Sequence, residues 1–167
     1  RDSKLDNMMS FARKDLHNPF HSGIVKEDIR SGMFALRPDK SKIAVMELGV
    51  TKKQYDHLGE VMNSYWLKRE ELGFNFAGLI SMLFFGVGVP VEGEFFCSQW
   101  VATVLQEVGI DLFPEKSLYN IRPFDFYCLL QQQIIYEGMS KDYMSNQPIT
   151  PISAVESKIL KKSLKQI

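Results

Sequence analysis

The chain has 167 residues, of which 45% are hydrophobic and 24% are charged, as is typical of a single globular domain that buries its own core. Lysine and arginine together number 20, as do aspartate and glutamate, so the formal net charge is zero. This balance argues against a phosphate-binding surface, and we expect no nucleic-acid partner. The two cysteines, Cys97 and Cys128, have neither a disulfide framework nor zinc-ligand spacing, so we expect no metal and no cofactor.

The first part of the chain is predicted to form strands. We predict them at residues 8–13, 33–36 and 43–48, with a polar turn at residues 37–41 between the last two. Residues 15–23 contain the pair Asn18-Pro19 and are predicted to be rich in turns rather than strand.

Two helices are predicted to follow. Thr51 is a favourable N-cap for a helix over residues 51–71, whose apolar residues fall on one face. The next helix, residues 76–85, is mostly apolar, and we expect it to be buried. The apolar run that contains it is broken by Asn75, three glycines and Pro90, so it falls short of the roughly 20 apolar residues of a membrane span. We therefore expect no membrane contact.

Cys97 closes a short aromatic run and opens a helix predicted to end at Gly109. The apolar residues of this helix recur with helical spacing: Trp100, Val101, Val104, Leu105 and Val108. The thiol therefore lies in the first turn, where unpaired N–H groups and the positive end of the helix dipole favour a thiolate. A thiolate is a nucleophile, so Cys97 is a candidate catalytic residue. The alternative is a buried cysteine that packs as a small hydrophobe.

The last part of the chain is predicted to contain a short helix at 124–130 and a strand at 134–137. Asp125 is predicted to cap the start of this helix, and Cys128 to pack in the core. We assign residues 1–144 to one domain and residues 145–167 to a linker and a basic amphipathic helix. We expect this tail helix to dock on its own domain or on a second copy, which makes it a candidate homo-oligomer contact. The alternative is a helix that binds a membrane surface or a partner protein.

Several stretches together resemble a known family. Residues 95–102, Phe-Phe-Cys-Ser-Gln-Trp-Val-Ala, resemble the nucleophile helix of the NlpC-type papain-like cysteine hydrolases, and most closely their circularly permuted, bacterial branch. Residues 34–55 are similar to the strand-then-helix of that branch, and residues 74–79 to its aromatic-Asn-x-x-Gly-Leu helix start. Residues 122–126 resemble its Pro-x-Asp-Phe element, and residues 135–138 its closing strand. The resemblance covers roughly residues 5 to 140 and leaves out the tail.

This resemblance implies an α+β fold of papain-like type, in which an antiparallel sheet or half-barrel packs against the cysteine helix. It also implies a thiol hydrolase that cleaves an amide or peptide bond through a thioester on Cys97, with the backbone N–H of Cys97 stabilising the oxyanion. Two alternatives stay open: an inactive binding or assembly module on the same fold, and a lipid acyltransferase. The substrate is accordingly a peptide, an amide or an acyl group.

The resemblance also implies a histidine base and a third polar group. In permuted members the histidine lies on a strand ahead of the one assigned to residues 8–13, so we expect it upstream of Arg1. Within the chain His21 is a candidate base, together with His17, whereas His57 is expected to be solvated. Ser10 is the candidate third polar group. Cysteine usage leaves the compartment open, and we favour a cytoplasmic location over export.

Overall fold

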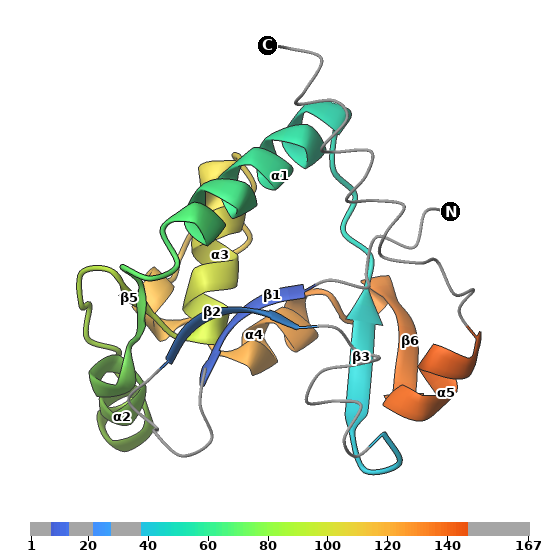
Figure 1. Cartoon of the computed structure of the whole chain (residues 1–167). Helices are drawn as coiled ribbons and strands as arrows, with labels where there is room; N and C mark the ends of the chain where they lie inside the picture. Colours follow the sequence, from blue (N-terminus) through green and yellow to red (C-terminus); the bar gives the residue numbers. More distant parts are fainter. Residues whose placement is uncertain (1–7, 14–21, 28–37, 147–167) are drawn as a thin grey trace.

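The computed structural model describes residues 8–13, 22–27 and 38–146, and these form an α+β fold (Figure 1). The strands of this part of the chain pair two by two. The antiparallel pairs are β1 (Met8–Arg13) with β2 (Ser22–Glu27) and β3 (Lys42–Met46) with β6 (Ile134–Met139). The parallel pair is β4 (Gly73–Phe74) with β5 (Glu94–Phe95). Among the described strands these pairs are not joined into one continuous sheet.

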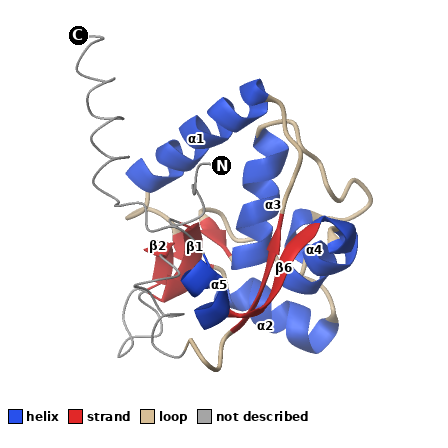
Figure 2. Ribbon diagram, turned by 90° about the vertical axis from the view of Figure 1, so that its right-hand side faces the viewer, coloured by secondary structure: helices blue, strands red, loops and turns tan. Residues whose placement is uncertain are grey.

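The described part of the chain also contains five α-helices: α1 (Lys52–Leu67), α2 (Phe76–Phe85), α3 (Cys97–Glu107), α4 (Pro123–Leu129) and α5 (Ser140–Asn146). Two short 3-10 helices, η3 (Leu118–Asn120) and η4 (Gln131–Gln133), flank α4. Figures 1 and 2 both show α1 beside α3, while β1 and β2 lie below these two helices. The helix that begins at Cys97 therefore packs against both a helix and an antiparallel pair of strands.

The core is centred on α3. Its residues Trp100 and Val104 are buried, and with Val108 just beyond the helix they pack against Ile24 of β2 and Val61 of α1. Burying a side chain of this size stabilises a fold by roughly 1.5–3 kcal/mol. Trp100 and Val104 recur with helical spacing and so place one face of α3 in the core. Cys97, the first residue of α3, is exposed and is not part of this core.

Several predicted elements are confirmed. The strand at residues 8–13 and the helix at residues 76–85 have the predicted bounds. Thr51 caps α1: its Oγ1 accepts a hydrogen bond from Gln54 N at 3.2 Å, and its backbone N–H donates to Gln54 Oε1 at 3.0 Å. This helix ends at Leu67, earlier than the predicted residue 71.

Strand β2 and helix α5 were not predicted, and neither were the two-residue strands β4 and β5. Strand β2 begins at Ser22, inside a segment predicted to be turn. Its residues form a strand by pairing with β1, and no local sequence pattern indicates this pairing. Helix α5 follows β6 directly and includes Ser145, which had been assigned to the linker. Buried Ser140 fixes its start: the N–H donates to Ser41 O at 2.8 Å and Oγ to Pro38 O at 3.1 Å. The predicted strand at 33–36 and helix at 153–167 lie outside the described residues.

Burial of α2 is the prediction that the structure contradicts most clearly. Gly78 and Met82 are buried, but the large side chains at its C-terminal end, Leu83, Phe84 and Phe85, are exposed. Apolar composition predicts burial on all sides, whereas the described part of the chain covers only one face of this helix. No helix among the described residues is both long and apolar enough to cross a membrane.

Candidate active site

The start of α3 is positioned by the short parallel pair that precedes it. In β4, Gly73 N donates to Gly93 O at 3.0 Å, and just beyond it Asn75 N donates to Phe95 O at 3.1 Å. These bonds join the segment that enters α2 to the segment that enters α3. Cys97, the first residue of α3, is therefore fixed relative to the start of α2 by backbone hydrogen bonds.

Asn75 fastens the loop between the two helices. Its side chain is fully buried, its Oδ1 accepts from Gly78 N at 2.6 Å, and its Nδ2 donates to Val89 O at 2.8 Å. A Cβ at Gly78 would lie 2.5 Å from Asn75 Nδ2 and 2.6 Å from Val89 O, so a glycine is needed there. The amide thus caps α2 and at the same time holds the loop that leads to Cys97.

A second contact fixes the same loop from the other side. Gly88 N donates to Asn120 Oδ1 at 2.7 Å, and a Cβ at Gly88 would lie 1.9 Å from Tyr119 O. The backbones of the two segments are therefore in direct contact, which only a residue without a side chain permits.

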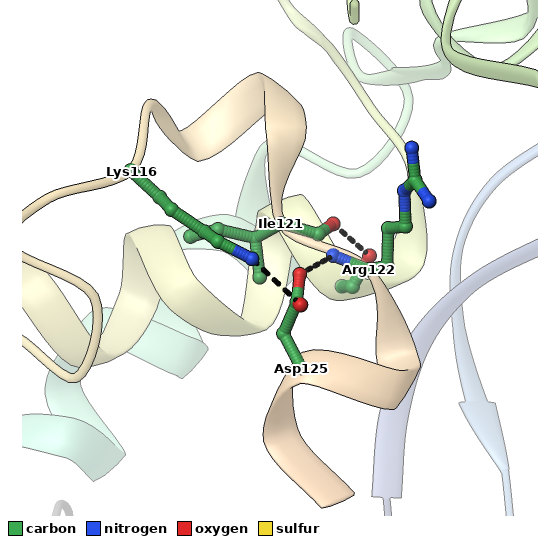
Figure 3. Close-up of polar contacts among 5 residues, drawn as sticks. Lys116, Ile121, Arg122 and Asp125 are labelled. Carbon is green, nitrogen blue, oxygen red and sulfur yellow. Dashed lines mark hydrogen bonds and ion pairs between the residues drawn. The ribbon is translucent and has the colours of Figure 1, made fainter. Parts of the chain in front are cut away.

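The first turn of α3 has one exposed side chain, that of Cys97. The next three residues, Ser98, Gln99 and Trp100, are buried. Ser98 Oγ donates to Ile121 O at 2.7 Å and so ties this turn to the segment before α4 (Figure 3). The buried alternative therefore does not describe Cys97, whose thiol is accessible on an otherwise anchored turn.

The N-terminus of α3 lacks the side-chain cap that α1 and α2 have. Thr51 and Asn75 accept hydrogen bonds from first-turn N–H groups of those helices. Phe96, the N-cap of α3, makes no side-chain cap hydrogen bond, and Gln99 Oε1 satisfies only the N–H of Phe96, at 3.4 Å. First-turn N–H groups have no acceptor within a helix, so those of α3 remain for an anionic ligand or thiolate.

A polar cluster lies at the start of α4, next to Ile121 (Figure 3). Asp125 accepts from Lys116 Nζ at 2.7 Å and from Arg122 N at 2.8 Å, as a helix-start cap was predicted to do. These two bonds, with Lys116 the larger influence, lower the pKa of the Asp125 carboxyl from its ordinary value of 3.8. Figure 3 shows the Arg122 guanidinium on the side opposite to Lys116 and Asp125.

An open hollow of about 430 Å³ adjoins this cluster. Its lining is mostly polar and comprises Gly86, Glu115, Lys116, Ser117, Asn120, Arg122 and Asp125. Cys97 is not among these residues. Ile121, whose carbonyl accepts the hydrogen bond from Ser98, directly precedes Arg122, which lines the hollow, so the segment before α4 contributes to both regions.

Ser10 lies in β1 opposite Val25, while His17 and His21 are outside the described residues. His57 is exposed, as predicted, and lies in α1. The described residues therefore bring no histidine to Cys97.

The prediction for Cys128 is wrong. Its thiol is exposed, because α4 is a short surface helix with no buried residue. Apolar neighbours in the sequence suggested burial, but α4 has too few turns to build a covered face. The chain therefore has two accessible thiols at opposite ends of two different helices.

Comparison with protein-family models, with curated proteins and with solved structures finds no match to this chain. The likeness to papain-like hydrolases therefore rests on the motifs quoted above and on their order. The described residues also contain no group of three or more histidine, cysteine, aspartate or glutamate side chains that could hold a metal ion.

No local sequence pattern indicates the contacts that hold the site. Nothing in the segment around Ser98 indicates that its hydroxyl reaches Ile121, since the two are 23 positions apart. Asn75 belongs to a predicted helix start, but its hydrogen bond to Val89 O forms only because the loop after α2 folds back towards the start of that helix. Arg122-Pro123 followed by Asp125 is the one local signal, because proline in the first turn and an acidic side chain at the third position mark a helix start.

Proposed function

We propose that the chain is a thiol hydrolase that cleaves an amide or peptide bond through a thioester on Cys97. The observation that carries the proposal is an accessible thiol on the first residue of an uncapped helix, whose next three residues are buried. A helix N-terminus of this kind stabilises a thiolate and the oxyanion formed when it attacks a carbonyl.

The reaction has two stages. The Cys97 thiolate adds to the acyl carbon and forms a C–S bond, while the C–N bond breaks and the leaving amine takes a proton from the protonated base. Water, deprotonated by the same base, then attacks the thioester and releases the acid and the thiolate. The backbone N–H of Cys97 donates to the oxyanion in both stages.

The base of this proposal is a histidine, either His21 or one that precedes Arg1, the position that the resemblance implies. Ser10 is proposed as the third polar group. Its strand, β1, packs against α3 and pairs antiparallel with β2. An antiparallel pair against the cysteine helix supports a papain-like fold, although this sheet has only two strands among the described residues. The proposed substrate is a peptide or another amide.

A binding or assembly module is the second candidate. It is favoured by the polar hollow beside Asn120 and Arg122, which does not include Cys97, and by the absence of a histidine near Cys97 among the described residues. If this candidate is correct, a ligand binds in the hollow and Cys97 has no special reactivity.

Rates of alkylation separate the two candidates, because Cys128 is also exposed and serves as an internal control. Cys97 begins α3, whereas Cys128 lies in the last turn of α4, at the negative end of a helix dipole. We expect iodoacetamide to modify Cys97 about fivefold faster than Cys128 at neutral pH, as measured by peptide mass spectrometry after short exposure. Equal rates, or faster modification of Cys128, would contradict the proposal.

A further inference from the structure

The polar hollow next to Gly86 is lined by charged side chains of both signs in equal number. Its cations are Lys116 and Arg122, and its carboxylates are Glu115 and Asp125. Lys116 and Asp125 form an ion pair of 2.7 Å and so neutralise each other. The charges that remain for a ligand are therefore one guanidinium, on Arg122, and one carboxylate, on Glu115.

Neither of these two charged groups has a partner within the described residues. No hydrogen bond or ion pair joins the Arg122 guanidinium or the Glu115 carboxylate to another group there. Figure 3 shows the guanidinium directed away from Lys116 and Asp125. Both side chains are exposed. A ligand that supplies the opposite charges can therefore pair with both of them and leave the bond between Lys116 and Asp125 intact.

Asn120 adds an uncharged donor to the lining of the hollow. Its Oδ1 accepts a hydrogen bond from Gly88 N at 2.7 Å, and its Nδ2 has no acceptor within the described residues. A carboxylate or a phosphate accepts several hydrogen bonds at once and pairs closely with a guanidinium. Arg122 and Asn120 together therefore suit the anionic group of a ligand, and Glu115 suits an ammonium group.

Hydrogen bonds within the chain already hold the backbone around the hollow. Lys116 N donates to Phe113 O at 3.0 Å and Asn120 N to Ser117 O at 2.9 Å, while Asn120 Oδ1 also holds the loop at Gly88. A ligand then has to order side chains alone, which lowers the entropic cost of binding. The volume of about 430 Å³ is that of a small-molecule site, and the mostly polar lining favours a small polar ligand.

We propose that the hollow binds a small zwitterion, with its anionic group on Arg122 and Asn120 and its ammonium group on Glu115. Short zwitterionic peptides and the headgroup of phosphatidylethanolamine share this chemistry. A simple anion would leave Glu115 unpaired beside a like charge, and a simple cation would do the same to Arg122. The inference goes beyond the proposed hydrolase reaction and is independent of the chemistry of Cys97.

NMR titration of the ¹⁵N-labelled full chain carrying Cys97→Ala tests the proposal, because this variant rules out turnover by the proposed reaction. The probes are glycylglycine and glycerophosphoethanolamine. At least one is expected to shift the amide resonances of Gly86, Ser117 and Asn120 to saturation, and the tighter of the two identifies the source of the zwitterion. The N-acetyl form of each probe lacks the ammonium group, and glycylglycine amide lacks the carboxylate. Each is expected to bind roughly tenfold more weakly than its parent.

Substitutions assign the two charges. Glu115→Gln is expected to make a probe and its N-acetyl form bind equally, and Arg122→Gln to make glycylglycine and its amide bind equally. The controls Glu60→Gln and Lys53→Gln, at exposed positions of α1, are expected to leave these ratios unchanged. The absence of saturable shifts with both probes overturns the proposal. Binding of the N-acetyl or amide forms as tight as that of the parent probes also overturns it, since the ligand is then not recognised as a zwitterion.

Discussion

The position of Cys97 is held by hydrogen bonds of residues that take no part in the proposed reaction. Asn75 holds the loop ahead of it, and Ser98 ties the first turn of its helix to Ile121. A buried amide with both hydrogen bonds made stabilises the fold, and leaving either partner unpaired costs about 1–3 kcal/mol. The site therefore depends on individual buried polar side chains at least as much as on the thiol.

Two helical glycines give a matched test at this scale. Gly78→Ala places a Cβ 2.5 Å from Asn75 Nδ2 and 2.6 Å from Val89 O, whereas nothing lies within 4 Å of a Cβ at Gly59. We expect Gly78→Ala to lower the free energy of unfolding by about 2 kcal/mol or more, because the loop contact must open. Gly59→Ala is expected to raise it by about 0.5–1 kcal/mol through helix propensity.

Urea unfolding followed by circular dichroism measures both changes. If both Gly78→Ala and Gly59→Ala stabilise the protein, the loop at Val89 is not in close contact with Gly78, and the prediction is wrong. Destabilisation by both would show that the interior of α1 is more crowded than the open space around Gly59 indicates.

At the scale of elements, the start of α4 depends on Asp125. The pKa of this carboxyl is lowered by its bonds to Lys116 and Arg122, so its contribution to stability is complete above pH 3.8 and is lost as pH falls through the folded-state pKa. We expect Asp125→Asn to reduce the free energy of unfolding by about 1 kcal/mol at neutral pH, the usual worth of a helix-start cap. The difference from the parent should shrink towards zero in strong acid.

Urea unfolding of parent and variant at several pH values between 2 and 7 measures this difference. Asp39→Asn, which removes a carboxylate from an exposed turn, is the control for a change in net charge alone. A difference that stays constant down to the lowest pH would contradict the assignment of Asp125 as an ionised cap.

Local sequence patterns predicted where several helices and strands lie better than they predicted the contacts between them. Thr51 marked the start of α1. Of the apolar residues predicted to share one face of the cysteine helix, Trp100, Val104 and Val108 are buried, whereas Val101 is exposed. Strand β2 escaped prediction because it is defined by its pairing with β1, and α5 because its start is fixed by contacts with Pro38 and Ser41. Such contacts join distant parts of the chain and leave no local pattern.

At the scale of the whole molecule, the largest error concerned which apolar residues are covered. A helix as apolar as α2 is normally buried, yet its Phe84 and Phe85 are exposed in the single chain. Composition specifies that such a surface must be covered but does not say by what.

The account as a whole depends on whether Cys97 carries an acyl group. Incubation of the full chain with p-nitrophenyl acetate, followed by peptide mass spectrometry, tests this directly, because an activated ester needs no protonation of its leaving group and so does not depend on the histidine base. We predict one acetyl group on Cys97, released by hydroxylamine, retained in Cys128→Ala and absent from Cys97→Ala. Acetylation of Cys128 to the same extent, or of neither cysteine, would contradict the account.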